Sequence, residues 1–144
     1  MTNNKQFEQI VELITQDLSS DPALQSACLK IVNYLQNQPF KEVRHLTQQS
    51  ILTLLQHRFA DELLINTLRY LTGNRANILE THFELIDDDD EPYYLDPSSV
   101  SSLQKTGVLY HPYTGEPVED PTQKVYLFFS PSESFKKLQV NNAT

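Results

Sequence analysis

The sequence contains no tryptophan, one cysteine, one methionine and three glycines. The single cysteine, Cys28, excludes an internal disulfide, and its place among apolar helical positions indicates a buried thiol rather than a nucleophile. The three glycines lie far apart, which excludes a glycine-rich phosphate loop. No apolar run approaches the roughly 18 residues that a membrane-spanning helix needs. These scarcities indicate a globular chain and no association with a membrane.

Patterns for metal and nucleophile chemistry are missing as well. The four histidines are scattered, and no Cys-x-x-Cys or His-Glu-x-x-His spacing occurs. The acidic run Asp87–Glu91 lacks the alternating ligands and the turn glycine of a calcium loop. There is no Gly-x-Ser-x-Gly motif, and no apolar pocket flanks the clustered carboxylates to separate their pKa values. We therefore expect a protein that is not an enzyme and that holds no metal or cofactor.

The negative charge is concentrated in one part of the sequence. The chain has 11 basic and 19 acidic residues, for a net charge of −8. Residues 1–79 hold seven of each sign, whereas residues 80–120 hold eleven acidic residues and one basic residue, Lys105. Such a block repels phosphate and attracts basic surfaces. A solvated surface that only keeps the protein in solution is the simpler interpretation.

The first half of the sequence predicts helices. Apolar residues within 7–18 recur at the spacing of an amphipathic helix. Asp21 is a typical N-cap for a second helix with Pro22 at its first position, and Thr47 is a plausible N-cap for a third. Residues 41–46 fit either a short strand or the start of the next helix.

The next stretch predicts a turn, a helix and a strand. Residues 58–61 are typical of a turn, and Asp61 can cap a helix that ends near Gly73. Residues 78–86 alternate as in a strand, with Leu79, Thr81, Phe83 and Leu85 on one face.

Shorter elements are predicted near the C-terminus. Asp96 and the proline after it start a helix that ends at Gly107. Strands are expected at 108–110 and 124–129, with a proline-rich loop between them and a turn of helix around 134–138.

Helices first and strands last give an α+β fold, with an N-terminal helical bundle and a small C-terminal antiparallel sheet. The length predicts a single domain over residues 1–140. Its expected parts are an N-terminal helix (1–20), a helix-turn-helix-like core with the first strand (21–90), and an acidic, Pro- and Tyr-rich insertion with the last strand (91–138).

The stretch from Thr47 to Ile86 orders two short helices, a tight turn and a strand, and this order resembles the winged helix-turn-helix superfamily. The resemblance is one of pattern and covers about residues 21–130. It implies a winged-helix-like core with residues 61–72 as the recognition helix. The sequence departs from the superfamily in the long insertion, 87–123, between the two candidate wing strands.

One function that the resemblance implies is a winged-helix DNA-binding transcriptional regulator. In such a protein Asn66 would read adenine and Arg69 guanine, with Arg75 nearby. Affinity for DNA rests mainly on the neutralisation of phosphates. The acidic residues where a wing would carry Lys or Arg therefore make this the alternative interpretation.

The favoured interpretation is a small regulatory or accessory protein, inhibitor- or immunity-like, that binds a partner protein with a basic surface. The candidate contact residues are acidic or aromatic: Asp87, Asp88, Asp89, Asp90, Glu91, Tyr93, Tyr94 and Tyr113. The N-terminal residues do not form a basic segment followed by an apolar core, as a signal peptide would. We therefore expect a cytoplasmic protein, located in the host cytoplasm if the source is viral.

Overall fold

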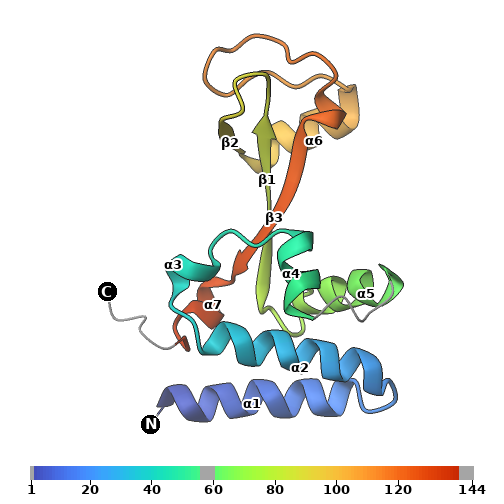
Figure 1. Cartoon of the computed structure of the whole chain (residues 1–144), viewed down its shortest axis with the longest axis vertical. Helices are drawn as coiled ribbons and strands as arrows, with labels where there is room; N and C mark the ends of the chain where they lie inside the picture. Colours follow the sequence, from blue (N-terminus) through green and yellow to red (C-terminus); the bar gives the residue numbers. More distant parts are fainter. Residues whose placement is uncertain (1, 56–60, 140–144) are drawn as a thin grey trace. The chain divides into compact units, whose positions relative to one another are not determined.

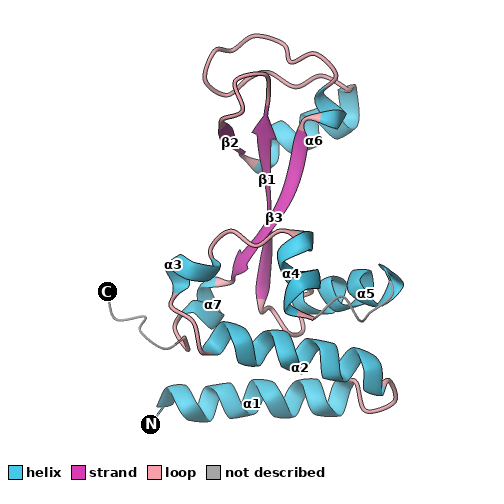
Figure 2. Cartoon of the chain, in the orientation of Figure 1, coloured by secondary structure: helices cyan, strands magenta, loops and turns pink. Residues whose placement is uncertain are grey.

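The computed structural model describes residues 2–55 and 61–139 and has an α+β fold (Figure 1). Its helices and strands are α1 (Thr2–Asp17), α2 (Pro22–Gln36), α3 (Phe40–Val43), α4 (Gln48–Leu54), α5 (Asp61–Thr72), β1 (Leu79–Ile86), β2 (Pro92–Leu95), α6 (Pro97–Thr106), β3 (Val125–Pro131) and α7 (Glu133–Lys136), with a 3-10 turn at Pro121–Gln123 (Figure 2). The predicted turn at 58–60 and the side chain of Asp61 fall outside the described residues.

Residue contacts divide the chain into two compact units. Unit 1 comprises Met1–Glu80 and Phe129–Thr144, and unit 2 comprises Thr81–Phe128. Unit 1 has nine basic and nine acidic residues in its sequence, whereas unit 2 has two basic and ten acidic ones. The whole net charge of −8 therefore belongs to unit 2. That the chain forms one domain stays a prediction.

Helices α2 and α4 of unit 1 begin where side chains cap them. The Asp21 carboxylate accepts a hydrogen bond from the Leu24 N–H at the start of α2, with Pro22 in the first turn. Thr47 and Ser50 form a reciprocal capping box at the start of α4. Both predicted caps are confirmed. Each cap joins two residues that lie three positions apart in the sequence, so the local sequence is enough to predict it.

The core of unit 1 is helical. Helix α2 packs against α1 and α5. Six apolar or thiol side chains of α2 and α5 contribute to this core: Cys28, Ile31, Leu35, Leu64, Leu68 and Leu71. Phe135 of α7 packs into the same cluster and is only 1% exposed.

Residues 41–46, which were predicted as either a short strand or the start of a helix, contain a part of each. Helix α3 ends at Val43. Leu46 then exchanges two backbone hydrogen bonds with Phe129, of 2.8 and 2.7 Å, in an isolated β-bridge. The segment is therefore a turn of helix followed by one residue paired with β3.

The three strands form an antiparallel sheet in the order β2-β1-β3. In β1 and β2, Leu85 lies opposite Tyr93 and Glu84 lies opposite Tyr94. Strand β2 was not predicted, because its four residues look like the end of a polar loop until they are paired with β1.

The register of β1 and β3 follows from two hydrogen bonds. The Ile86 N–H donates to the Lys124 carbonyl at 2.9 Å, and the Ser132 N–H donates to the Ile78 carbonyl at 2.8 Å. Both bonds fit one antiparallel alignment, which also places Glu84 opposite Tyr126 and His82 opposite Phe128.

Unit 2 has its own small core on one face of the sheet. The residues of this core are Leu85, Leu95, Val100, Leu103, Leu109 and Val118. Helix α6 supplies two of them and is capped as predicted, because the Asp96 carboxylate accepts from the Ser99 N–H and Gly107 ends the helix with a φ of 77°.

One of the predicted strands is wrong. Residues 108–110 do not form a strand, and only Tyr110 pairs, in an isolated bridge with Pro117. The strand predicted at 78–86 is confirmed as β1, but burial does not follow its two faces, because Thr81 is exposed and Glu84 is buried. The reason is that Leu79 belongs to the core of unit 1 and Leu85 to the core of unit 2, so β1 does not bury one continuous face.

Candidate functional site

A tight turn in unit 2 carries five consecutive acidic residues, Asp87–Glu91, and is called the acidic turn below. The Asp90 N–H donates to the Asp87 carbonyl at 2.9 Å, and Asp90 adopts a left-handed φ of 58°. Asp tolerates this conformation better than most residues, because its short side chain can bond the nearby backbone. The sequence of the turn is therefore compatible with its shape as well as with its charge.

Asp87 anchors one end of the acidic turn to Lys124, the residue that precedes β3. Its carboxylate lies 2.9 Å from the Lys124 ammonium and also accepts from the Asp88 N–H at 2.8 Å. The bond from Lys124, followed by that from the backbone of Asp88, lowers the pKa of Asp87 below its usual value. Asp87 is thus ionised at neutral pH and is largely engaged within the protein.

Asp89 anchors the other end to β2. Its carboxylate accepts from the Tyr93 hydroxyl at 2.6 Å and from the Glu91 N–H at 3.1 Å. These two bonds, with that from Tyr93 first, lower the pKa of Asp89. The same contact raises the pKa of Tyr93 to about 12, because the neighbouring carboxylate disfavours a phenolate.

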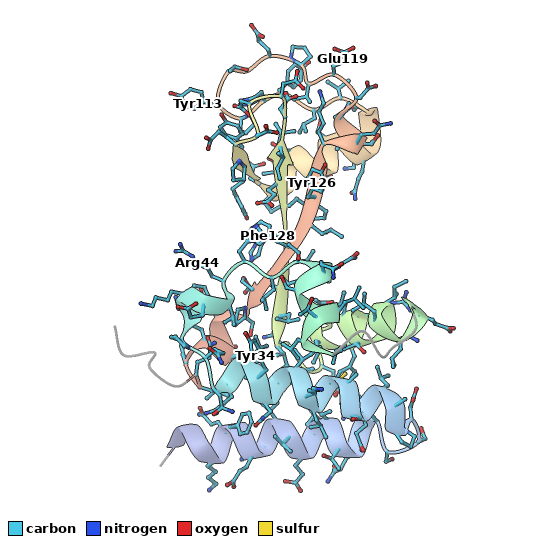
Figure 3. All side chains as sticks on the ribbon, in the orientation of Figure 1. Tyr34, Arg44, Tyr113, Glu119, Tyr126 and Phe128 are labelled. Atoms are coloured by element: carbon cyan, nitrogen blue, oxygen red, sulfur yellow. The ribbon has the colours of Figure 1, made fainter. Side chains whose placement is uncertain are left out.

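Tyr93 also joins the acidic turn to a second loop. Its ring meets the His111 ring edge-on at a centroid distance of 4.4 Å, and it lies 6.4 Å from the ring of Tyr113. Tyr113 is 84% exposed (Figure 3). We call Tyr93, His111 and Tyr113 the aromatic cluster. Its contacts place the acidic turn and the 111–115 loop in one surface.

His111 shapes the loop that carries Tyr113. Its Nδ1 accepts hydrogen bonds from the backbone N–H groups of Tyr113, at 3.0 Å, and Thr114, at 3.2 Å. These bonds assign the ring proton to Nε2. Gly115 closes the turn with a φ of 76°, and its N–H donates to the His111 carbonyl. The imidazole thus accepts backbone hydrogen bonds as an Asp or Asn side chain does in an Asx turn.

The remaining three carboxylates of the acidic turn face solvent. The side chain of Asp88 is 98% exposed and lies 3.9 Å from Lys124. Asp90 and Glu91 are exposed, and no group in residues 2–55 or 61–139 hydrogen-bonds their carboxylates. Three like charges within four residues raise the local negative potential, which a cationic partner would relieve.

Tyr94 lies apart from the other predicted contact residues. It neighbours Tyr93 in β2, so its side chain projects from the opposite face of the sheet. Its ring lies 5.9 Å from that of His82, which stacks on Phe128 at 5.0 Å. The structure therefore brings together Asp87–Glu91, Tyr93 and Tyr113, and it places Tyr94 on a different surface.

The residues of the alternative DNA surface lie in unit 1. On α5, Arg69 is exposed and Asn66 is half-buried. Arg75 donates through Nε, at 2.6 Å, and through Nη2, at 2.8 Å, to the Asp17 carboxylate, which also accepts from the Tyr70 hydroxyl. Asp17 thus neutralises one of the two arginines that were expected to meet phosphate.

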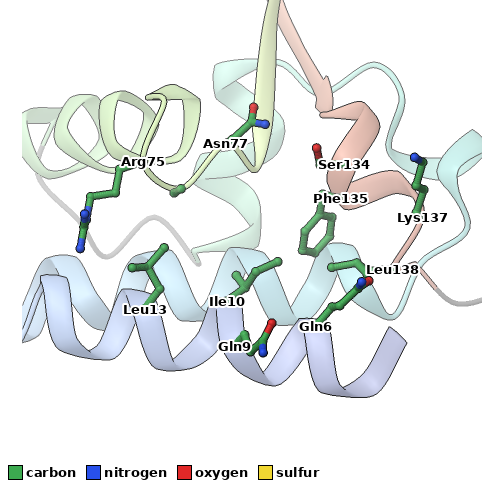
Figure 4. Close-up of a pocket in the computed structure, with 11 residues that line it drawn as sticks. Gln6, Gln9, Ile10, Leu13, Arg75, Asn77, Ser134, Phe135, Lys137 and Leu138 are labelled. Carbon is green, nitrogen blue, oxygen red and sulfur yellow. The ribbon is translucent and has the colours of Figure 1, made fainter. Parts of the chain in front are cut away.

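A groove lies beside α1 in unit 1 (Figure 4). It has a volume of about 470 Å³, an apolar floor that includes Ile10, Leu13 and Phe135, and the cationic side chains of Arg75 and Lys137 at its rim. Its lining contains no Asp, Glu, His or Cys, so it offers no pair of groups for acid–base chemistry.

Across residues 2–55 and 61–139, no group of three or more His, Cys, Asp and Glu side chains is arranged to hold a metal ion. Within the same residues, no helix combines the length and the apolar character needed to cross a bilayer.

Comparisons with protein-family models, curated proteins and solved structures gave no significant match to this chain.

Two residues that shape the acidic surface were not among the sequence candidates. Lys124 is far from Asp87 in the sequence, and only the pairing of β1 with β3 brings them together. His111 is one of the four scattered histidines, none of which was a candidate site residue. A usable signal did exist, because His111 precedes a Pro-Tyr-Thr-Gly turn whose N–H groups need a side-chain acceptor.

Proposed function

We propose that this protein is a small, non-enzymatic, cytoplasmic regulatory or accessory protein that binds a partner protein with a basic surface. The contact surface consists of the acidic turn with Tyr93 and Tyr113. The exposed carboxylates attract and orient the partner, and the exposed ring of Tyr113 supplies apolar contact area. An inhibitor- or immunity-like role against a nucleic-acid-binding protein fits this chemistry, since such a protein carries the basic surface required.

The observation that carries the proposal is the double contact of Tyr93. Its hydroxyl bonds Asp89, and its ring packs against His111 beside Tyr113. A solubilising acidic loop needs neither a fixed shape nor an adjacent aromatic ring. The concentration of the full −8 charge in unit 2 supports the proposal further.

A winged-helix DNA-binding regulator is the second candidate. The order α4, α5, β1 and β3 and the exposure of Arg69 on α5 favour it. Unit 1 has no net positive charge, however, and Asp17 neutralises Arg75. The winged-helix-like character of the core is part of this second proposal.

The test is an affinity capture from a lysate of the native source with a charge variant. Asp88→Asn, Asp90→Asn and Glu91→Gln remove three exposed charges and retain the anchoring Asp87 and Asp89. Asn also accepts the left-handed φ of position 90. The expected result is loss of a protein partner that the unmodified chain captures even after nuclease treatment.

The matched control removes the same number of charges from unit 1, through Glu8→Gln, Glu12→Gln and Glu62→Gln at exposed helical positions. Capture should survive in the control. Equal loss of capture in both variants would show that the net charge, and not the acidic turn, determines binding. Capture that depends on nucleic acid and on Arg69, with a steep dependence on salt, would establish the DNA interpretation instead.

A further inference from the structure

His111 holds the loop of Tyr113 through bonds that only an uncharged imidazole can make. Its Nδ1 atom accepts from the backbone N–H groups of Tyr113, at 3.0 Å, and Thr114, at 3.2 Å. A neutral imidazole has one ring nitrogen that accepts, whereas a protonated imidazole carries a proton on both nitrogens and accepts nothing. Protonation of His111 therefore replaces two hydrogen bonds with three N–H groups that point at one another.

The other bonds of this loop do not involve the imidazole ring. The His111 N–H donates to the Glu116 carbonyl at 2.8 Å, and the Gly115 N–H donates to the His111 carbonyl at 2.9 Å. Both bonds can persist when the ring is protonated. In the part of the chain that the structure describes, the N–H groups of Tyr113 and Thr114 have no acceptor besides Nδ1. Protonation thus releases the tip of the loop and leaves its base closed.

Two carboxylates of the acidic turn act on the charge of His111. The pKa of Asp87 is lowered first by the bond from Lys124 and also by His111. The pKa of Asp89 is lowered first by the bond from Tyr93 and also by His111. Both carboxylates are therefore ionised throughout the range from pH 8 to pH 5, and each attracts an imidazolium at position 111.

The other titratable groups around the ring do not change their charge in this range. Tyr93 of β2 packs edge-on against His111, and the bond to Asp89 raises the pKa of Tyr93 to about 12. Tyr113 and Glu116 are the remaining titratable residues of the loop. Histidine is the side-chain type that ordinarily changes its charge between pH 5 and 8. A change of this surface within that range is thus attributable to His111.

We propose that His111 is a pH-sensitive switch of the partner-binding surface, and that its protonation releases the loop tip that carries Tyr113. This inference deepens the proposed function and rests on it for the effect on the partner. In the uncharged form, the two bonds to Nδ1 keep Tyr113 beside Tyr93. In the protonated form these bonds are lost, and the imidazolium offsets part of the charge of Asp87 and Asp89. Both changes weaken the attraction for a basic partner, so acid releases the partner.

The test follows the full chain, labelled with nitrogen-15, by NMR from pH 8 to pH 5. A scalar coupling between the amide nitrogens of Tyr113 and Thr114 and Nδ1 of His111 exists only while the N–H···N bonds are made. We expect both couplings at pH 8 and neither at pH 5, with the same midpoint as the ring signals of His111. Couplings that are absent at pH 8, or that persist after the ring is protonated, would overturn the switch. A ring that stays unprotonated at pH 5 would overturn it as well.

Two variants serve as controls for the assignment of this transition. His111→Asn keeps an acceptor that does not titrate, so the amide signals of Tyr113 and Thr114 should no longer change between pH 8 and pH 5. His45→Gln removes an exposed histidine of unit 1 and should leave the transition as it is. A transition that persists in His111→Asn, or that disappears in His45→Gln, would belong to another group and would overturn the inference.

Binding of a dye-labelled oligolysine peptide, measured by fluorescence anisotropy at pH 8 and pH 5, tests the effect on a basic partner. The affinity of the unmodified chain should fall roughly 2- to 5-fold more than that of His111→Asn, as expected for one exposed charge. An equal decline in both chains would overturn the control of binding by His111.

The outcomes separate this inference from the proposed function. Loss of oligolysine binding at pH 8 in the charge variant of the acidic turn would support the proposed function, whatever the couplings show. Absence of oligolysine binding to the unmodified chain at pH 8 would count against the proposed function. The couplings would in that case still decide whether protonation of His111 releases the loop.

Discussion

Replacing His111 separates its two structural contributions to the loop of Tyr113. The imidazole accepts two backbone hydrogen bonds through Nδ1 and packs its ring on Tyr93 at 4.4 Å. His111→Ala removes both contributions, and His111→Phe retains only the ring. His111→Asn retains only an acceptor, because Asn makes the same turn without a charge. The neutral side chain also avoids a further negative charge beside the acidic turn.

The expected magnitudes follow from these contacts. Each lost backbone bond costs about 0.5–1.5 kcal/mol, with the lower end appropriate to an exposed loop. The edge-on ring contact contributes a similar amount, about 0.5–1 kcal/mol. His111→Ala should therefore lower the free energy of unfolding by about 2 kcal/mol, and His111→Asn and His111→Phe by about 1 kcal/mol each.

Urea denaturation followed by tyrosine fluorescence gives these differences, and amide hydrogen exchange at Tyr113 and Thr114 gives the local effect. Exchange at both amides should accelerate in His111→Ala and His111→Phe and stay slow in His111→Asn. Equal stability of His111→Ala and His111→Asn, together with unchanged exchange at the two amides, would refute the acceptor role of the imidazole.

Two further predictions concern unit 1. Cys28 is fully buried and burial raises the pKa of its thiol to about 12, so a thiol reagent should modify it only after urea unfolds the chain; rapid stoichiometric modification of the folded protein would contradict this. The bonds from Arg75 and Tyr70 lower the pKa of Asp17, so its stabilising effect is complete above the usual carboxyl pKa of about 4 and is lost as the pH falls below it. Asp17→Asn should flatten that acid-side decline in the urea midpoint, and an unchanged decline would show that this carboxylate does not contribute to it.

Elements with local signals were predictable from the sequence. The caps at Asp21, Thr47 and Asp96 each bond an N–H three residues ahead, and Gly107 takes the left-handed conformation that ends a helix. The acidic turn was also predictable from the sequence, because its five acidic residues are consecutive.

Features that depend on strand pairing were not predictable. Strand β2 has only four residues and is stabilised by pairing with β1, so its composition alone did not identify it. The ion pair between Asp87 and Lys124 depends on β3 lying next to β1. The place of Tyr94 was not predictable for a related reason, because adjacent residues of an unrecognised strand point to opposite faces, and Tyr94 neighbours Tyr93 in β2.

The bond between Ile78 and Ser132 has a consequence for how this chain can change over evolution. It holds together, within unit 1, the two segments between which the whole of unit 2 is inserted. Closing a connection between neighbouring segments costs little entropy, and the cost rises only slowly with the length of the connection. Unit 2 can therefore lengthen, shorten or be exchanged while unit 1 keeps its core. The stretch between these two segments is in this way replaceable, and the helical unit serves as the constant part of the fold.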